Sequence, residues 1–250
     1  MGPDLELALE LADAADAIAL RRFRAGDLRV ETKPDLTPVT EADHAIEREL
    51  RRLLAERRPD DAVLGEEQGA TGSGSTRWIL DPIDGTRNYT RGIPIWATLI
   101  ALERDGELVA SAVSAPALGR RWWAERGVGA WRDDGERLHV SAVARLEEAC
   151  ALLTYGNGVA PGARDAWHVR GFGDFWAHML VAEGAADVAV DAVGVTEWDL
   201  AAPRLVVEEA GGRFTDFSGA ARSDGGSAVA SNGLLHETAL ATLVPTQATG

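Results

Sequence analysis

The segment with the clearest capacity for chemistry is W-I-L-D-P-I-D-G-T-R-N, residues 78–88. Its apolar start predicts a buried strand that carries two carboxylates, Asp81 and Asp84, to a proline–glycine turn. Gly85 and Thr86 follow where a helix is expected to begin, so free backbone N–H groups lie next to the acids. Carboxylates suit a divalent cation and N–H groups suit a phosphate, so the segment predicts a site that takes both.

Three more carboxylates lie where predicted elements begin or end. Asp43 falls in the first turn of a predicted helix, with Thr40 as its cap. Glu66 follows a short apolar strand, and Asp199 lies in W-D-L-A-A near another helix start. A single such acid is more often a helix cap or a solvated side chain. Several acids that converge repel one another unless a divalent ion lies between them, so the whole set predicts a metal site.

The remaining sequence predicts the elements that position these acids. Helices are expected at 4–24, 41–57, 174–183, 197–210 and 233–243, and strands at 62–66, 78–81, 95–102, 108–114, 120–124, 128–131, 149–154, 186–191 and 227–230. Breaks within 95–131 indicate consecutive antiparallel strands, whereas 27–40 and 69–76 are expected to be loops or extended segments. Pro203 predicts a kink or an irregular start in its helix. These elements predict an α/β fold with antiparallel strands, in which helices lie between layered sheets.

Composition limits the classes of function. The chain has 250 residues, 46% hydrophobic and 26% charged, as in an ordinary soluble globular protein. Its net charge of -15 argues against a nucleic acid or an anionic membrane as partner, because both need a basic face. The sequence predicts neither a signal peptide nor a membrane span of roughly 20 apolar residues. A single cysteine, Cys150, excludes an intrachain disulfide, so we expect a cytoplasmic protein.

The chain resembles the inositol-monophosphatase-like family of magnesium-dependent phosphatases over nearly its whole length. The resemblance is carried by T-E-A-D (40–43), G-E-E (65–67), the 78–88 segment, W-D-L-A-A (198–202) and E-E-A-G-G (208–212). It implies one domain over 1–250, with an N-terminal half to about 140 and a C-terminal half from about 141. The implied fold is a layered α-β-α-β-α sandwich of the inositol monophosphatase and fructose-1,6-bisphosphatase type. A homodimer is implied as well, and one of the tryptophans is expected to be exposed at a subunit contact.

The resemblance also implies a set of metal ligands. Glu66, Asp81 and the backbone carbonyl of Ile83 would hold a first Mg²⁺. Asp81, Asp84 and Asp199 would hold a second, with Asp81 shared between the two ions. The family pattern leaves room for a third ion near Glu66, and Mn²⁺ is an alternative metal. The histidines show no metal-ligand spacing, so none of them is expected to bind metal.

The same resemblance gives roles in the reaction. Asp43 and Thr86 would orient the attacking water, with Glu66 counted among the catalytic groups through its metal. The N–H groups of Gly85 and Thr86 would take phosphate oxygens, and Asp84 would border the same phosphate. Lys33 lies in a segment that covers the site in the family, from which it would reach the phosphate.

Within the family, residues 94–99, 170–176 and 225–233 are most similar to histidinol-phosphate phosphatases of the inositol-monophosphatase type. Relatives that act on polyols tend to carry a small residue at position 174, where this chain has Asp174. Histidinol phosphate carries a cationic amine, which an acid at the mouth of the site would favour. Phe175 or Trp176 would then face the imidazole ring.

Several of these assignments have open alternatives. Asp174 is alternatively a helix cap, and Trp176 alternatively belongs to the core. Arg170 would contact the phosphate or a partner subunit's site, or make a surface ion pair. Asp191 is the candidate for an acid that touches the substrate. It lies one residue farther from the W-D motif than the family pattern has, and Glu197 competes for that role.

The sequence therefore predicts a Mg²⁺-dependent phosphatase that acts on a small phosphorylated metabolite. L-histidinol phosphate, an intermediate of histidine biosynthesis, is the substrate that the resemblance favours. Inositol 1-phosphate or another polyol phosphate is the main alternative, and 3′,5′-adenosine bisphosphate a further one. A metal-binding regulator without turnover is the alternative from another class. The chain has no G-x-x-x-x-G-K-[ST] loop of a nucleotide-binding kinase.

Overall fold

The computed structural model describes residues 1–154, 163, 165–191 and 194–244. Within these ranges the helices are α1 (Pro3–Arg22), α2 (Glu41–Arg57), α3 (Thr86–Thr90), α4 (Asp174–Ala182), α5 (Glu197–Glu209) and α6 (His236–Thr242). The strands of the N-terminal half are β1 (Val30–Thr32), β2 (Pro38–Thr40), β3 (Ala62–Gly65), β4 (Gly69–Thr71), β5 (Thr76–Asp84), β6 (Ala97–Arg104), β7 (Glu107–Ala115), β8 (Arg120–Glu125) and β9 (Gly129–Arg132). Those of the C-terminal half are β10 (Cys150–Thr154), β11 (His168–Arg170), β12 (Val188–Asp191), β13 (Arg213–Thr215) and β14 (Ala228–Ser231).

A seven-stranded sheet forms the centre of the N-terminal half, in the order β4-β3-β5-β6-β7-β8-β9. Only β3 and β5 run parallel, and the other neighbours are antiparallel. Strand β6 shows why its sequence is apolar without interruption: Leu99 and Ala101 face one core, and Ile100 and Leu102 face another. Both faces of the sheet are therefore covered, which is why the alternation of polar and apolar residues is lost.

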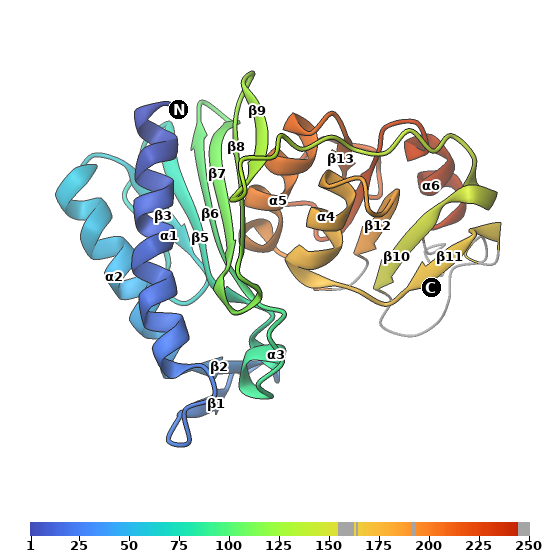
Figure 1. The fold of residues 1–250 in the computed structure, drawn as a ribbon. Helices are drawn as coiled ribbons and strands as arrows, with labels where there is room; N and C mark the ends of the chain where they lie inside the picture. The colour runs from blue at the N-terminus through green and yellow to red at the C-terminus, as the bar shows by residue number, and fades with distance from the viewer. Residues whose placement is uncertain (155–162, 164, 192–193, 245–250) are drawn as a thin grey trace.

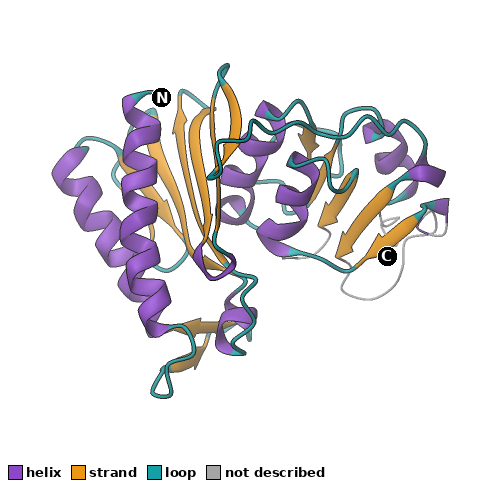
Figure 2. Ribbon diagram, in the orientation of Figure 1, coloured by secondary structure: helices purple, strands orange, loops and turns teal. Residues whose placement is uncertain are grey.

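Helices and sheets alternate through the molecule (Figures 1 and 2). Helices α1 and α2 pack on the outer face of the seven-stranded sheet, and α4 and α5 lie between that sheet and a five-stranded one. The second sheet has the order β11-β10-β12-β14-β13, and α6 covers its far face. One core cluster joins β6 to α4, α5 and β12, so the two halves share buried surface. The predicted α-β-α-β-α sandwich is confirmed.

The structure corrects several predicted boundaries. Residues 69–71 form β4 rather than a loop, and the 27–40 segment contains a short antiparallel hairpin of β1 and β2. Strand β5 continues through Pro82 to Asp84, with a bulge between Asp81 and Asp84 in place of the expected turn. Strands β11 and β13 were not predicted, since three residues are too few to show a period.

Helix α5 contains Pro203 and is helical on both sides of it. The proline removes one backbone N–H donor but does not end the helix. Among the described helices, none combines the length and the apolar character that crossing a membrane requires.

Candidate active site

The candidate site lies where β5 ends and helices α2, α4 and α5 begin. Asp81 and Asp84 flank the bulge at the end of β5, and Asp199 comes from the first turn of α5. One carboxylate oxygen from each of these three residues lies within 4.8 Å of the other two. Thr98 Oγ donates to the carbonyl oxygen of Pro82 at 2.8 Å, which satisfies the bulged backbone. The bulge thus lets two acids from one strand converge on the same point.

Two of the acids are fixed by the same device. Thr40 caps α2, and its N–H and Oγ donate to Asp43 Oδ2 at 2.8 and 2.5 Å. Thr196 caps α5, and its N–H and Oγ donate to Asp199 Oδ2 at 2.6 and 2.8 Å. Each is a capping box that leaves Oδ1 of the aspartate free for the site. The sequence predicted the first of these boxes from Thr40 and Asp43.

The remaining two aspartates differ in how they are satisfied. Asp84 Oδ2 accepts the N–H of Phe175, the second residue of α4, at 2.6 Å. Asp81 is 1% exposed, and its Oδ1 has no hydrogen-bond partner within the described part of the chain. A buried carboxylate oxygen without a donor is costly, and a cation at the centre of the trio removes that cost. The donor set therefore fits a divalent ion that prefers oxygen ligands.

Electrostatics agree with this fit. Burial, followed by the negative charge of Glu66, raises the pKa of Asp81 well above its ordinary value. Burial, followed by the charge of Asp174, does the same to the pKa of Asp84. Burial raises the pKa of Asp199 to about 6 and the pKa of Asp43 to about 7. Without a cation, the folded protein therefore holds these acids partly protonated near neutral pH.

Thr86 links the acids to the start of α3. Its Oγ donates to the carbonyl oxygen of Ile83 at 2.9 Å and lies 3.4 Å from Asp43 Oδ1. Gly85 precedes it with a φ of 80°, and a Cβ there would lie 3.1 Å from the carbonyl oxygen of Ile95. A side chain at position 85 would therefore strain the backbone that aligns Thr86.

Glu66 and Lys33 form an ion pair beside the trio. Lys33 Nζ donates to Glu66 Oε1 and Glu67 Oε1, both at 2.7 Å. Burial lowers the pKa of Lys33, but the two carboxylates outweigh it and hold the pKa above its ordinary value. Lys33 thus lies at the site, as predicted, but its partners are acids. Its ammonium group partly offsets the negative charge of Glu66, which acts on Asp81.

Glu47 is a supporting residue that the sequence analysis missed. It is 0% exposed on α2, one turn after Asp43. Its carboxylate accepts the N–H groups of Glu67 and Gln68 at 2.7 and 3.1 Å and the guanidinium of Arg51 at 2.8 Å. These bonds fix the turn that carries Glu66. The signal in the sequence was the glycine of G-E-E, since a Cβ at Gly65 would lie 2.2 Å from Glu47 Oε1.

The predicted substrate acids are brought to the same place. Asp174 opens α4 with a φ of 54°, and its Oδ2 lies close to Gly85. It keeps access to solvent, yet the protein around it raises its pKa by desolvation. Asp191 ends β12; burial, and then the charges of Asp174 and Asp199, raise its pKa to about 7. Asp191 therefore lies near the other acids, although it is one residue farther from the W-D motif than the family pattern has.

Other candidates lie elsewhere. Glu197 pairs with Arg77, which also binds Glu103 on β6, so Glu197 joins α5 to the sheet rather than facing the trio. Arg170 is exposed on β11 and donates to the carbonyl oxygen of Val169 at 2.9 Å. None of the described contacts connects Arg170 to the acids.

The aromatic part of the prediction is wrong for Phe175. This ring is 0% exposed and packs in the shared core, 6.1 Å from the ring of Trp122. Trp176 is half-buried and lies 5.9 Å from Trp122 in an edge-on arrangement. Asp174 does not cap α4 through its side chain in the described hydrogen bonds, so that alternative also fails.

Comparisons with known proteins agree with this geometry. The profile of the inositol monophosphatase family matches residues 2–248. The chain is 53% identical to a histidinol-phosphatase of Mycobacterium tuberculosis over 254 aligned positions, covering 96% of this chain and 97% of that protein. It is 35% identical to an inositol-1-monophosphatase of Rhizobium meliloti, covering 82% of each chain. The crystal structure of the extragenic suppressor protein SuhB from Bartonella henselae matches with a TM-score of 0.87 and 30% identity, covering 96% of this chain and 98% of that one.

The raised pKa values predict how Mg²⁺ affects stability. In EDTA, the contribution of Asp43 and Asp191 to the free energy of unfolding should fall as pH rises from about 4 to about 7, because these residues titrate near 7 when folded whereas unfolded aspartate titrates near 3.8. Mg²⁺ should therefore raise Tm more at about pH 8 than at about pH 5. The buried His178 and His236, whose pKa values are lowered to about 4, act in both samples and cancel. An equal rise in Tm at both pH values would contradict the coupling between ion and acids.

Gly65→Ala tests the support that Glu47 gives to the Glu66 turn. The new methyl group would displace a buried carboxylate held by three donors, which should cost about 1–3 kcal/mol of folding free energy. It should also weaken Mg²⁺ binding, measured as the midpoint of the Tm increase. Gly26→Ala is the matched control, because a Cβ at Gly26 meets nothing within 4 Å. Equal stability of the two variants would show that Glu47 moves freely.

Proposed function

The chain belongs to the inositol monophosphatase family, and we propose that it is a Mg²⁺-dependent phosphatase that hydrolyses L-histidinol phosphate to L-histidinol and phosphate. Phosphomonoester hydrolysis is supported by the 53% identical histidinol-phosphatase, of which this chain covers 97%. The observation that carries the proposal is the trio of Asp81, Asp84 and Asp199, with a buried oxygen of Asp81 that a cation would satisfy. Asp174 beside the trio supports the cationic substrate.

The residues present would hold two ions. Asp81, Asp84 and Asp199 would share one, and Glu66, Asp81 and the carbonyl of Ile83 would share the other. Divalent ions there would supply positive charge against the anionic ester and lower the pKa of the water that attacks it. Lys33 bonds to Oε1 of Glu66, so Glu66 would hold the ion through Oε2 or after release of Lys33. We propose Mg²⁺ because the donors are carboxylate and carbonyl oxygens.

Asp43 and Thr86 are the groups that would handle the water. Thr40 holds Asp43 Oδ2 with two donors, so only Oδ1 faces Thr86 and the site. The Thr86 hydroxyl would orient the water, and the proton that the water loses would pass to Asp43. Burial raises the pKa of Asp43 above its ordinary value in the metal-free protein, which favours proton acceptance over a fully solvated carboxylate.

The phosphate would lie over the start of α3. The described hydrogen bonds give the N–H groups of Gly85 and Thr86 no acceptor, so both are available to phosphate oxygens. Asp84 borders this position as an ion ligand. Lys33 would reach the phosphate after release from Glu66, and its ammonium group would add one more positive charge.

Asp174 would select the alcohol part of the substrate. Its left-handed backbone conformation is unusual for a residue other than glycine, and it places the carboxylate next to Gly85 and the phosphate position. A carboxylate there attracts the amine of histidinol phosphate more strongly than the hydroxyl groups of a neutral polyol. Asp191 would contact the same part of the substrate from the end of β12.

Inositol 1-phosphate or a related polyol phosphate is the second candidate. The observation in its favour is the buried Phe175, which removes one of the two rings expected to face an imidazole. The 35% identity to an inositol-1-monophosphatase is consistent with that alternative. The first candidate is preferred because Asp174 and the higher identity point to the same substrate.

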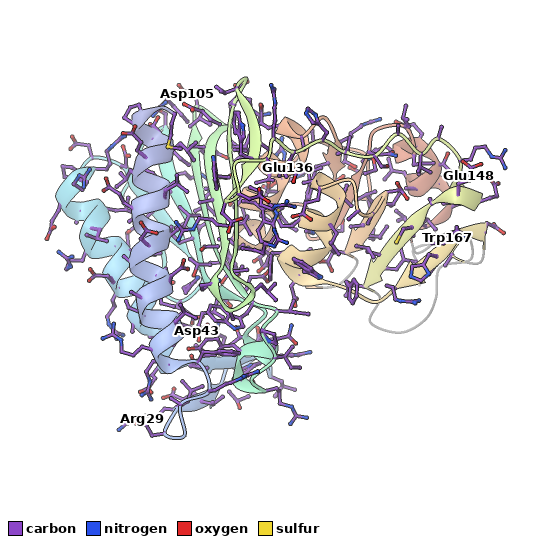
Figure 3. All side chains as sticks on the ribbon, viewed as in Figure 1. Arg29, Asp43, Asp105, Glu136, Glu148 and Trp167 are labelled. Carbon is purple, nitrogen blue, oxygen red and sulfur yellow. The ribbon has the colours of Figure 1, made fainter. Side chains whose placement is uncertain are left out.

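We also propose a cytoplasmic homodimer. Trp167 is 70% exposed at the start of β11, the edge strand of the second sheet, and Arg170 lies on the same strand. Figure 3 shows Trp167 at the end of the molecule farthest from α1 and α2. A large exposed aromatic side chain beside an edge strand is typical of a subunit contact.

Phosphate release with and without EDTA tests the function. Wild-type protein with Mg²⁺ should release phosphate from L-histidinol phosphate faster than from inositol 1-phosphate, and EDTA should abolish both reactions. Asp84→Asn should reduce kcat by at least about 100-fold, because it removes a shared ligand charge while keeping an oxygen for the Phe175 N–H.

Asp105→Asn is the matched control for this loss of charge. Asp105 lies in the β6–β7 turn at the other end of the sheet from Asp43 (Figure 3), and its φ of 52° is one that asparagine tolerates. Its activity should equal that of wild type. Full activity of Asp84→Asn would refute the site, and equal or faster turnover of inositol 1-phosphate would refute the substrate.

Asp174→Asn tests recognition of the cation. Asparagine tolerates the left-handed backbone at this position, so the change removes charge without added strain. At saturating Mg²⁺, kcat/KM for L-histidinol phosphate should fall about 10- to 100-fold, the usual effect of a lost charge-assisted hydrogen bond. The same parameter for glycerol phosphate should change less than about threefold. Similar losses on both esters would show that Asp174 serves the site as a whole.

A further inference from the structure

A buried histidine without hydrogen bonds lies behind the candidate site. His178 is on α4, 1% exposed, and neither of its ring nitrogens has a partner among the residues that the structure describes. Burial lowers its pKa to about 4, so the ring is neutral at physiological pH. A neutral imidazole still carries one N–H donor and one acceptor. An apolar side chain of similar size would fill this place without burying an unpaired donor and an unpaired acceptor.

The ring of His178 lies near the carboxylate of Asp191. His178 Nε2 lies 3.9 Å from Asp191 Oδ2, which is slightly too far for a hydrogen bond. The described residues offer the Asp191 carboxylate no other donor. Its side chain is 9% exposed, so it retains some access to the site. Each group is therefore the partner that the other lacks, and a small rotation would bring them together.

His236 shows what a purely structural buried histidine looks like in this fold. It is 0% exposed, and its two ring nitrogens bond to Thr215 Oγ at 2.9 Å and Ser231 Oγ at 2.8 Å. Both of its nitrogens are thus satisfied without any ligand. His178 differs in this respect, although both rings lie in the C-terminal half.

Helix α4 connects this pair to the rest of the substrate region. Asp174, the first residue of α4, lies one helical turn before His178 in the chain. The helix also donates the Phe175 N–H to Asp84. Helix α4 thus places three groups: the Phe175 N–H that bonds to Asp84, the predicted specificity acid Asp174, and the buried ring of His178 next to Asp191.

We propose that His178 is a positioning residue for substrate binding: its Nε2–H donates to Asp191 Oδ2 when a substrate occupies the site. The bond would hold Asp191 so that Oδ1 accepts from the amine or hydroxyl of the phosphate ester. This inference rests on the proposed phosphatase function and deepens it. It assigns His178 to recognition of the alcohol part and gives it no direct role in the attack on phosphorus.

Steady-state kinetics with paired variants test this proposal. His178→Met removes the donor and keeps an adaptable apolar side chain, so KM for L-histidinol phosphate should rise about fivefold with kcat nearly unchanged. His178→Gln retains an N–H donor and should restore KM to within about twofold of wild type. Asp191→Ala should raise KM by itself, and His178→Met in that background should add nothing, because both changes break one contact.

Controls separate positioning from packing. His236→Gln should lower Tm and leave KM unchanged, because His236 is bonded away from the site. In wild type, adding L-histidinol with Mg²⁺ and phosphate should shift the ¹⁵N resonance of His178 Nε2, a readout that remains if His178→Met does not fold. Unchanged KM in His178→Met, additive effects with Asp191→Ala, or an unshifted resonance would overturn the proposal. A wild-type protein that releases no phosphate would instead overturn the function, and this inference with it.

Discussion

The repulsion among buried carboxylates is the constraint on which the rest of this structure depends. Oxygen atoms of Asp81, Asp84 and Asp199 lie within 4.8 Å of one another. The positive charge of Lys33 is bonded to Glu66 and not to any of these three acids. Such a cluster is unfavourable in a folded chain unless a rigid scaffold holds the acids and a cation lies between them. The fold supplies the first part through a strand bulge and two capped helices. The second part must come from outside the chain.

The rigid part uses few and ordinary devices. Threonine caps hold Asp43 and Asp199 by one oxygen each, and the α4 backbone holds Asp84 in the same way. In every case, the oxygen that is used for structure is not the one left for chemistry. Helix starts therefore do two tasks at once, because the backbone donors that need partners at a helix N-terminus also orient an acid. This economy explains why the site lies where elements begin.

Much of the site was predictable because it is encoded locally. The D-P-I-D-G-T segment and the Thr40–Asp43 spacing identify their carboxylates without any knowledge of distant contacts. Strands β4, β11 and β13 were missed because three residues form a strand only when a partner lies beside them. Glu47 and the buried Phe175 were misjudged for a related reason. Their environments are set by elements that meet only after folding, so periodicity says nothing about them.

The ligand trio also has a mechanical consequence. Asp81 and Asp84 belong to the large sheet, whereas Asp199 belongs to a helix of the second half of the chain. An ion among them is therefore a crosslink between segments more than a hundred positions apart in the chain. Such a link stabilises the folded chain because the ion binds only where the three acids meet, whereas a disulfide would restrain the unfolded chain. The single cysteine rules out that covalent solution, and inorganic chemistry replaces it.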